Sequence, residues 1–294
     1  RFRQDIFRAD VETVTCQDGY SALRTLCRNL CPFSPANFIA KEIAMTTVFT
    51  CKDLFDDMMT CVYDAWASRL GHANVKLLTE PLGTRELFCT YRHIDAQPDK
   101  AASVVRTIRQ KISAHACRMV YRAAMSDQED KLDAIYRFLN LGFYQGPSVL
   151  DCLQYPAVMR LFELDRKVSN EAHYFKEFIR FFSYENRVLV SHIEPRSNVL
   201  TLISPYFSDR LPSENWMIID DGRMLAMVHP ADQPCYLTAL SPEEMKDLSR
   251  EPDDAFVGLW KGFFSHIGIH ERKNPRCQRS MLPLWYRKNM TEFR

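Results

Sequence analysis

Residues 215–229 read NWMIIDDGRMLAMVH, and this stretch decides the fold class. Its two halves are apolar and of strand length, and they flank Asp221-Gly222, a dipeptide typical of a tight hairpin turn. A second hairpin is expected upstream, where the apolar period changes to two: residues 176–184, a turn at Glu185-Asn186, and residues 187–195. We predict that these strands form one small antiparallel sheet.

The chain before these hairpins has helical rather than strand periodicity. The clearest helix is expected over about residues 156–176. Its apolar stripe consists of Leu161, Leu164, Val168, Ala172 and Phe175. At about 100° per residue, the opposite side of this helix is polar and is expected to face away from the core. It carries Arg166, Asn170, His173 and Glu177.

Further elements complete the prediction. Helices are expected over residues 52–70, 241–248 and 253–267, two or three more within residues 97–143, and short strands over residues 47–51 and 85–94. The predicted fold is therefore α+β, with a helix-rich N-terminal region, a small antiparallel meander sheet of about four strands and a helical, basic C-terminus.

The chain is expected to contain one domain behind an extension. Residues 1–44 share little of this patterning, so we interpret them as an upstream, poorly ordered extension and Met45 as a start site. Residues 45–294 are predicted to form a single domain, with a mainly helical part over residues 45–150 and the sheet with the C-terminal helices over residues 151–294.

The composition is that of a globular protein. The 294 residues carry a formal charge of +1, which excludes the uniformly basic composition of histone-like proteins. Ten cysteines are scattered without a CxxC pair, so we expect buried thiols in a reducing, cytoplasmic environment and no metal site. No signal-peptide core or membrane-length apolar run occurs, so no membrane contact is expected.

Recognisable catalytic motifs are absent from the sequence. GxSxG, HExxH, GxGxxG and P-loop patterns do not occur, and nine glycines make a phosphate-cradling loop improbable. We therefore expect a protein without a cofactor and without autonomous catalysis. The alternative is a cryptic enzyme acting on DNA or nucleotides, with Glu171 and His173 as an acid–base pair.

Charge is concentrated near the C-terminus. Residues 269–293 carry six lysines and arginines against two glutamates, whereas residues 240–259 carry six acids against two bases. Arg272, Arg276 and Arg279 recur at intervals of four and three, and Asn274-Pro275 is a typical start of a helix. Nearby apolar residues are expected to anchor this segment, namely Leu282, Leu284, Trp285 and Tyr286. The arginines would then contact phosphate or carboxylate, or they pair with the acidic stretch before them.

Aromatic residues also alternate in the strand expected at residues 176–184. One face of this strand would carry Phe178, Arg180, Phe182 and Tyr184. Sheets that bind single-stranded nucleic acid use this combination, because bases stack on aromatic rings while cations contact phosphates. The alternative is that these aromatic side chains belong to the core, with Arg180 paired to an acid.

A longer ordered set of residues is similar to a known family. The shared residues are Val168, Glu171, Ala172 and His173, then residues 178–181, then Phe207, Arg210, Trp216, Ile218 and Asp220, and finally Trp260, Arg272, Asn274, Pro275, Gln278, Met281, Pro283, Thr291 and Glu292. From about Met45 to Phe293, the sequence resembles the bacterial family described as probable DNA metabolism protein, a domain of unknown function. The chain departs from the family pattern at Tyr174-Phe175, where a basic residue and Met are usual, and at Tyr206, where His is usual.

The resemblance implies a role in DNA repair or modification. Genes of that family typically lie beside one for a radical S-adenosylmethionine protein, and some members are fused to a uracil-DNA glycosylase-like domain. The resemblance thus implies a DNA-binding accessory protein that acts with a radical S-adenosylmethionine enzyme, or else a protein-docking subunit without nucleic-acid contact. The predicted nucleic-acid-binding residues are Arg166, His173, Arg180, Arg210, Arg272, Asn274, Arg276, Gln278, Arg279 and Arg287.

Overall fold

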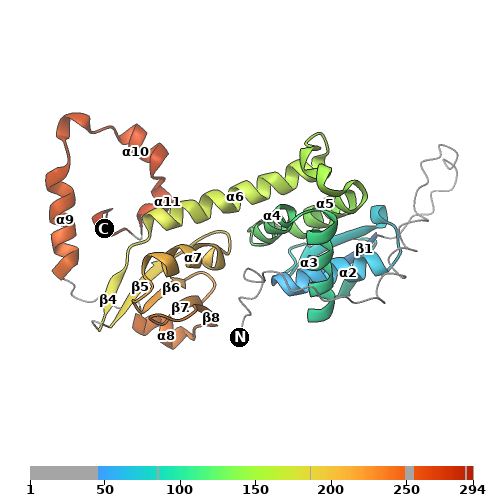
Figure 1. Cartoon of the computed structure of the whole chain (residues 1–294), viewed down its shortest axis with the longest axis horizontal. Helices are drawn as coiled ribbons and strands as arrows, with labels where there is room; N and C mark the ends of the chain where they lie inside the picture. Colours follow the sequence, from blue (N-terminus) through green and yellow to red (C-terminus); the bar gives the residue numbers. More distant parts are fainter. Residues whose placement is uncertain (1–45, 85, 186, 249–254, 289, 294) are drawn as a thin grey trace. The chain divides into compact units, whose positions relative to one another are not determined.

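The structure is a computed structural model that describes residues 46–84, 86–185, 187–248, 255–288 and 290–293. The chain divides into two units, residues 1–45 and residues 46–294. The extension predicted over residues 1–44 lies outside the described residues. The second unit contains the helices and strands shown in Figure 1.

A small parallel sheet lies at the start of the second unit. Its strands are β1 (Thr46–Cys51), β2 (Val75–Thr79) and β3 (Cys89–His93), in the order β2-β1-β3. Helix α2 (Phe55–Ala67) and a short 3-10 helix (His72–Asn74) connect β1 to β2, because parallel neighbours need a crossover. The sequence indicated β1 and β3, but it gave no signal for β2 or for a parallel sheet.

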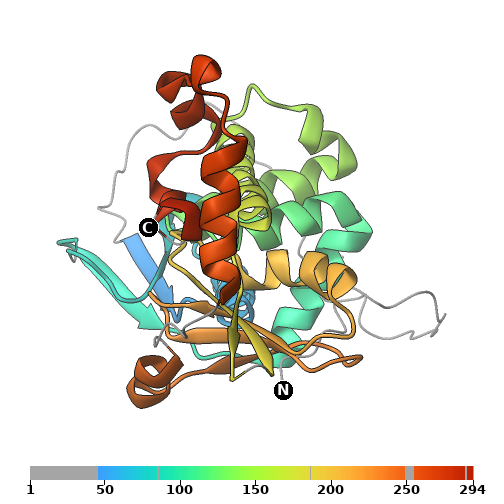
Figure 2. The ribbon, with the colours of Figure 1, turned by 90° about the vertical axis from the view of Figure 1, so that its left-hand side faces the viewer.

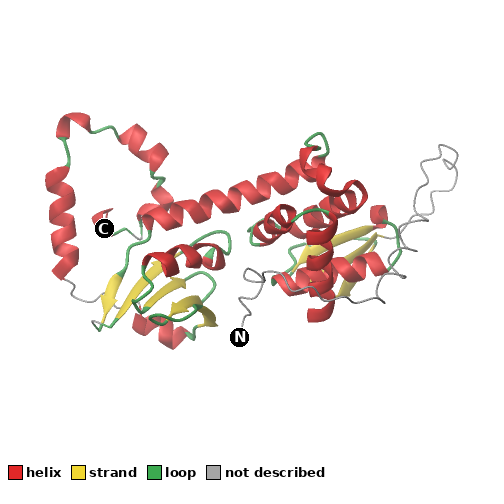
Figure 3. Ribbon diagram, viewed as in Figure 1, coloured by secondary structure: helices red, strands yellow, loops and turns green. Residues whose placement is uncertain are grey.

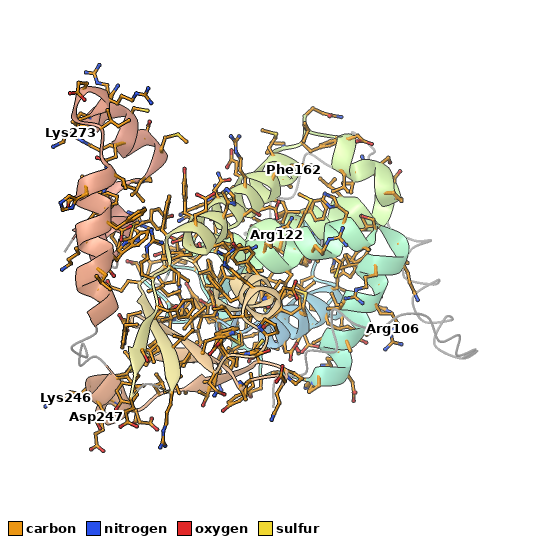
Figure 4. All side chains as sticks on the ribbon, turned by 60° about the vertical axis from the view of Figure 1, so that its left-hand side comes forward. Arg106, Arg122, Phe162, Lys246, Asp247 and Lys273 are labelled. Carbon is orange, nitrogen blue, oxygen red and sulfur yellow. The ribbon has the colours of Figure 1, made fainter. Side chains whose placement is uncertain are left out.

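Four helices continue the chain and share one apolar core with α2 and β1. They are α3 (Pro98–Lys111), α4 (Ala114–Ala124), α5 (Lys131–Gln145) and the long α6 (Pro156–Phe178), and a 3-10 helix (Gly146–Asp151) precedes α6. Arg122 of α4 donates a hydrogen bond to Asp165 of α6, and Phe162 of α6 packs against the core. Figure 4 labels Arg122 and Phe162 on these two helices. The helix-rich N-terminal region is thus confirmed.

The second sheet has five strands, one more than predicted. Their order is β4 (Phe182–Tyr184), β5 (Val188–Ile193), β6 (Trp216–Asp220), β7 (Leu225–His229) and β8 (Tyr236–Ala239). Both predicted hairpins are present, as the antiparallel pairs β4–β5 and β6–β7. The sheet is coloured yellow in Figure 3.

One pairing departs from a simple meander, because β5 and β6 are parallel. Helix α7 (Leu200–Arg210) carries the chain back between them, and its apolar residues pack in the same core cluster as Trp216 of β6. Helix α8 (Pro242–Leu248) contributes Met245 and Leu248 to the cluster on the opposite face of the sheet. The fold class is α+β, as predicted.

The aromatic strand predicted over residues 176–184 is wrong in its first half. Helix α6 continues to Phe178, because Phe175 and Ile179, four residues apart, are both buried in the same cluster. Only Phe182–Tyr184 form a strand. Phe178 packs on Tyr286, whereas the Phe182 ring stacks on that of His192, so these side chains do not form one nucleic-acid-binding face.

The C-terminal part of the chain is helical. It contains α9 (Ala255–Ile267), a 3-10 helix (His270–Arg272), α10 (Pro275–Met281), α11 (Leu284–Arg287) and a last 3-10 helix (Thr291–Phe293). We call residues 255–288 the C-terminal arm; Figure 2 shows it in red. Of the helices that the structure describes, none has the length and apolar character needed to cross a membrane.

Candidate functional site

The C-terminal arm is attached first through a buried carboxylate. The Glu292 side chain is 3% exposed, and Arg180 Nη2 donates to its Oε1 at 2.7 Å. Trp260 Nε1 of α9 donates to Oε2 at 3.1 Å, and the Arg180 guanidinium lies 6.0 Å from the Trp260 ring. Burial raises the pKa of Glu292, but the hydrogen bonds from Arg180, its own backbone and Trp260 outweigh it and lower this pKa below its usual value. Arg180 is therefore engaged in holding the arm.

A second attachment is aromatic. The Tyr286 ring of α11 lies 5.1 Å from the Tyr174 ring, 5.0 Å from the Phe175 ring and 6.0 Å from the Phe178 ring, all on α6. Burial, together with the nearby carboxylate of Glu171, raises the pKa of Tyr286. These contacts hold α11 against the C-terminal half of α6, so Tyr286 acts as the predicted anchor. Leu284 and Trp285, which were also expected to anchor this segment, are 62% and 42% exposed, so that part of the prediction is wrong.

Between these attachments, α10 presents its arginines to solvent. The Asn274 side-chain oxygen accepts a hydrogen bond from the Cys277 N–H at 3.0 Å, and Pro275 is the first helical residue. The predicted N-cap is thus confirmed. Residues 271–280 are exposed, including the predicted contacts Arg272, Asn274, Arg276, Gln278 and Arg279. Figure 4 labels Lys273 in this segment.

The next feature of this segment is the pairing of its exposed cations. Among the residues that the structure describes, no ion pair involves Arg272, Lys273, Arg276 or Arg279. Glu244, in the acidic stretch, instead accepts the Ser241 N–H at 2.7 Å and forms a capping box at the start of α8. Glu251, Asp253 and Asp254 lie outside the described residues. We call Arg272, Lys273, Arg276 and Arg279 the basic cluster.

The other predicted contacts lie on separate elements. Arg287 is committed internally, because its Nε and Nη2 donate to the Leu282 carbonyl and its guanidinium lies 4.8 Å from the Phe293 ring. Arg210 is the exposed last residue of α7. Arg166, Asn170, His173 and Glu177 are exposed along α6, which confirms the predicted polar row. Tyr286 contacts the aromatic residues that flank this row, so α11 lies beside it.

The candidate acid–base pair is not brought together. Glu171 is buried, and its two oxygens accept the backbone N–H groups of Arg196 at 2.7 Å and Ser197 at 3.0 Å. His173 is exposed on another side of α6 and lies 3.1 Å from Glu177. Glu171 thus holds a loop between β5 and α7.

That loop is held from the sheet as well. Asp220 is fully buried and accepts hydrogen bonds from the Gly222 N–H, the Arg223 N–H and Arg223 Nη1. Arg223 in turn donates to the carbonyls of Pro195 and Arg196. Burial raises the pKa of Asp220 against the opposing effect of Arg223. The backbone of Arg196 is therefore fixed at both its N–H and its carbonyl.

No sequence pattern indicated the role of Arg196. Its guanidinium lies 5.0 Å from the ring centre of Trp285, on α11, and Lys288 Nζ lies 4.4 Å from the same ring. Lys288 also pairs with Glu194. No local pattern connects Arg196 with Trp285, because the pair forms only when β5, α6 and α11 pack. Groups of three or more His, Cys, Asp or Glu side chains suited to a metal ion do not occur among the residues described.

Comparison with known families places this chain. The model of a family described as a domain of unknown function (DUF4130) matches residues 129–292, which include α6, the five-stranded sheet and the C-terminal arm. The chain belongs to this family. No match was found among the curated proteins or among the solved structures.

Acid is expected to release the Glu292 attachment. Because the folded pKa of Glu292 lies below the unfolded value of about 4.3, its stabilisation is complete above that value and is lost as the pH falls through the folded pKa. Fluorescence of Trp260 should report the change, and Trp260→Phe should remove the signal. Glu292→Gln should lack this acid transition; an unchanged transition in that variant would contradict the assignment.

Proposed function

We propose that this protein binds DNA through the C-terminal arm and serves as an accessory protein in DNA repair or modification. One observation carries the proposal: four cations within eight residues are exposed and, among the described residues, are in no ion pair. The whole arm has seven lysines and arginines and a single glutamate. A local surface of this kind attracts a polyanion even though the chain is nearly neutral.

The attachments of the arm favour this role. Glu292 and Tyr286 hold its two ends, and Asn274 caps α10. The backbone that carries the basic cluster is therefore restrained at both ends before DNA arrives, which lowers the entropic cost of binding. Arginine side chains suit phosphate because the guanidinium donates two parallel hydrogen bonds.

The proposed role is accessory rather than catalytic. Both oxygens of Glu171 accept backbone N–H groups, and His173 pairs with Glu177. The two side chains therefore do not form an acid–base pair. The resemblance to the DNA metabolism family supports a radical S-adenosylmethionine enzyme as the partner that supplies the chemistry. The seven described cysteines are all free thiols, in keeping with a reducing cytoplasm.

The test is a titration of labelled DNA with the full chain at several salt concentrations. We expect binding at low salt that weakens steadily as salt is added, because each neutralised phosphate contributes a slope of about −0.7 to −0.9 in log K against log salt. In a parallel pull-down, the neighbouring radical S-adenosylmethionine protein should be recovered with and without nuclease. Failure of the chain to bind either single-stranded or duplex DNA at low salt would contradict the proposal.

A further inference from the structure

We infer that the DNA taken by the C-terminal arm is single-stranded, and that unpaired bases stack on the exposed aromatic rings of the arm, with Trp285 as the main platform. This inference rests on the proposed function and names its substrate class. Surfaces that bind single strands combine cations for the phosphates with aromatic rings for the bases. The arm has both.

Exposed apolar side chains are concentrated on the arm. Among the described residues, nine of the 21 large hydrophobic side chains that are exposed belong to it. Four of the nine are aromatic, namely Trp260, Phe263, Phe264 and Trp285. Exposed apolar surface of this extent costs free energy in water and marks a binding surface.

Helix α9 shows that the body of the protein covers only part of this surface. Trp260 and Phe264 face the last 3-10 helix, where they contact Glu292 and Phe293. Leu259, Phe263 and Ile267 follow one another at intervals of four and are 69%, 52% and 57% exposed. This outer stripe has no cover within the described residues.

Trp285 is the best placed ring, because two cations lie beside it and the backbone of one of them is held by the buried Glu171. It is 42% exposed, with the cationic groups of Arg196 and Lys288 within 5.0 and 4.4 Å of its ring centre. Glu171 and Arg223 fix the Arg196 backbone. A base stacked beside this ring would have its phosphate within reach of these cations, and the basic cluster lies in the same arm, 6 to 13 residues before Trp285 in the chain.

Charge and stacking together argue against two other occupants, a second copy of this chain and a duplex. A second copy of this chain would bring one cationic arm against another, which is repulsive. A duplex would satisfy the cations but leave the aromatic rings in water, because its bases are already stacked on each other. A single strand satisfies both.

The experiment compares labelled oligothymidylate of about 16 nucleotides with a duplex of the same length. We expect the full chain to bind the single strand more tightly and its tryptophan fluorescence to be quenched. Trp285→Ala should weaken single-strand binding about tenfold and leave duplex binding nearly unchanged, and Trp285→Phe should restore most of the loss. Tyr144→Ala, which removes an exposed aromatic ring from α5, is the matched control and should change nothing.

Two results would overturn the inference in distinguishable ways. If the duplex bound as tightly as the single strand, or if Trp285→Ala weakened both equally, base stacking on Trp285 would be contradicted, but DNA binding by the arm would not. If the arm bound an acidic amphipathic peptide and neither form of DNA, the proposed function would be contradicted as well, and the partner of the arm would be a protein.

Discussion

Glu171→Ala is expected to lower the free energy of unfolding by about 3 kcal/mol. The Glu171 carboxylate is the acceptor for the backbone N–H groups of Arg196 and Ser197, and it lies in the interior at the C-terminal half of α6. Alanine leaves both donors without this partner, and each unsatisfied buried group costs about 1–3 kcal/mol. Urea denaturation followed by far-UV circular dichroism would measure the loss.

Two further variants make this result specific. Glu171→Gln keeps one carbonyl oxygen and a similar shape, so it should lose about half as much. His173→Ala removes an exposed side chain two residues away and should change stability by less than about 0.5 kcal/mol. If Glu171→Ala were as stable as His173→Ala, the carboxylate would not be a structural acceptor. The acid–base role considered for Glu171 would then be favoured again.

Simultaneous replacement of Arg272, Arg276 and Arg279 by alanine is expected to weaken single-strand binding about a hundredfold at 0.1 M salt. Each lost phosphate contact removes about 0.7 from the salt slope, which is close to a factor of five at that concentration, and three contacts multiply. These side chains are exposed and make no described ion pair, so the fold should be unaffected. Fluorescence anisotropy with labelled oligothymidylate would measure the affinity.

The control for this variant removes the same charge elsewhere. Arg106 of α3, Lys111 at the end of α3 and Arg118 of α4 are also exposed, and Figure 4 labels Arg106. Their replacement by alanine lowers the net charge equally but leaves the C-terminal arm intact. Affinity in this control should stay within about twofold of the wild type. Equal losses in the two triple variants would mean that net charge, not the arm, binds DNA.

Local patterns were enough to predict several parts of this structure. The stripe of α6 and its exposed row, including Arg166 and His173, depend on spacing along one helix. The cap at Asn274 and the hairpin at Asp221-Gly222 depend on neighbouring residues and were confirmed for the same reason. The basic cluster is exposed, as the polar residues around it in the sequence predicted.

Contacts between distant segments were beyond such patterns. The parallel pairing of β5 with β6 needs α7 to pack across the sheet, which no hairpin signal contains. Arg180 and Glu292 are 112 residues apart, and their hydrogen bond depends on how the last turn docks on the end of α6. The strand expected at Phe178 is absent because α6 continues to that residue, and Phe175 in its last turn and Ile179 directly after it are buried in one cluster. A local period of two was thus overridden by packing.

The salt dependence of oligothymidylate binding, measured side by side for the wild type and the triple arginine variant, is the most direct test of DNA binding by the arm. The four cations of the basic cluster predict a wild-type slope of log K against log salt of about −3, and loss of three of them should bring the slope to about −1. Absence of binding in the wild type, or the same slope in both proteins, would contradict DNA binding by the C-terminal arm.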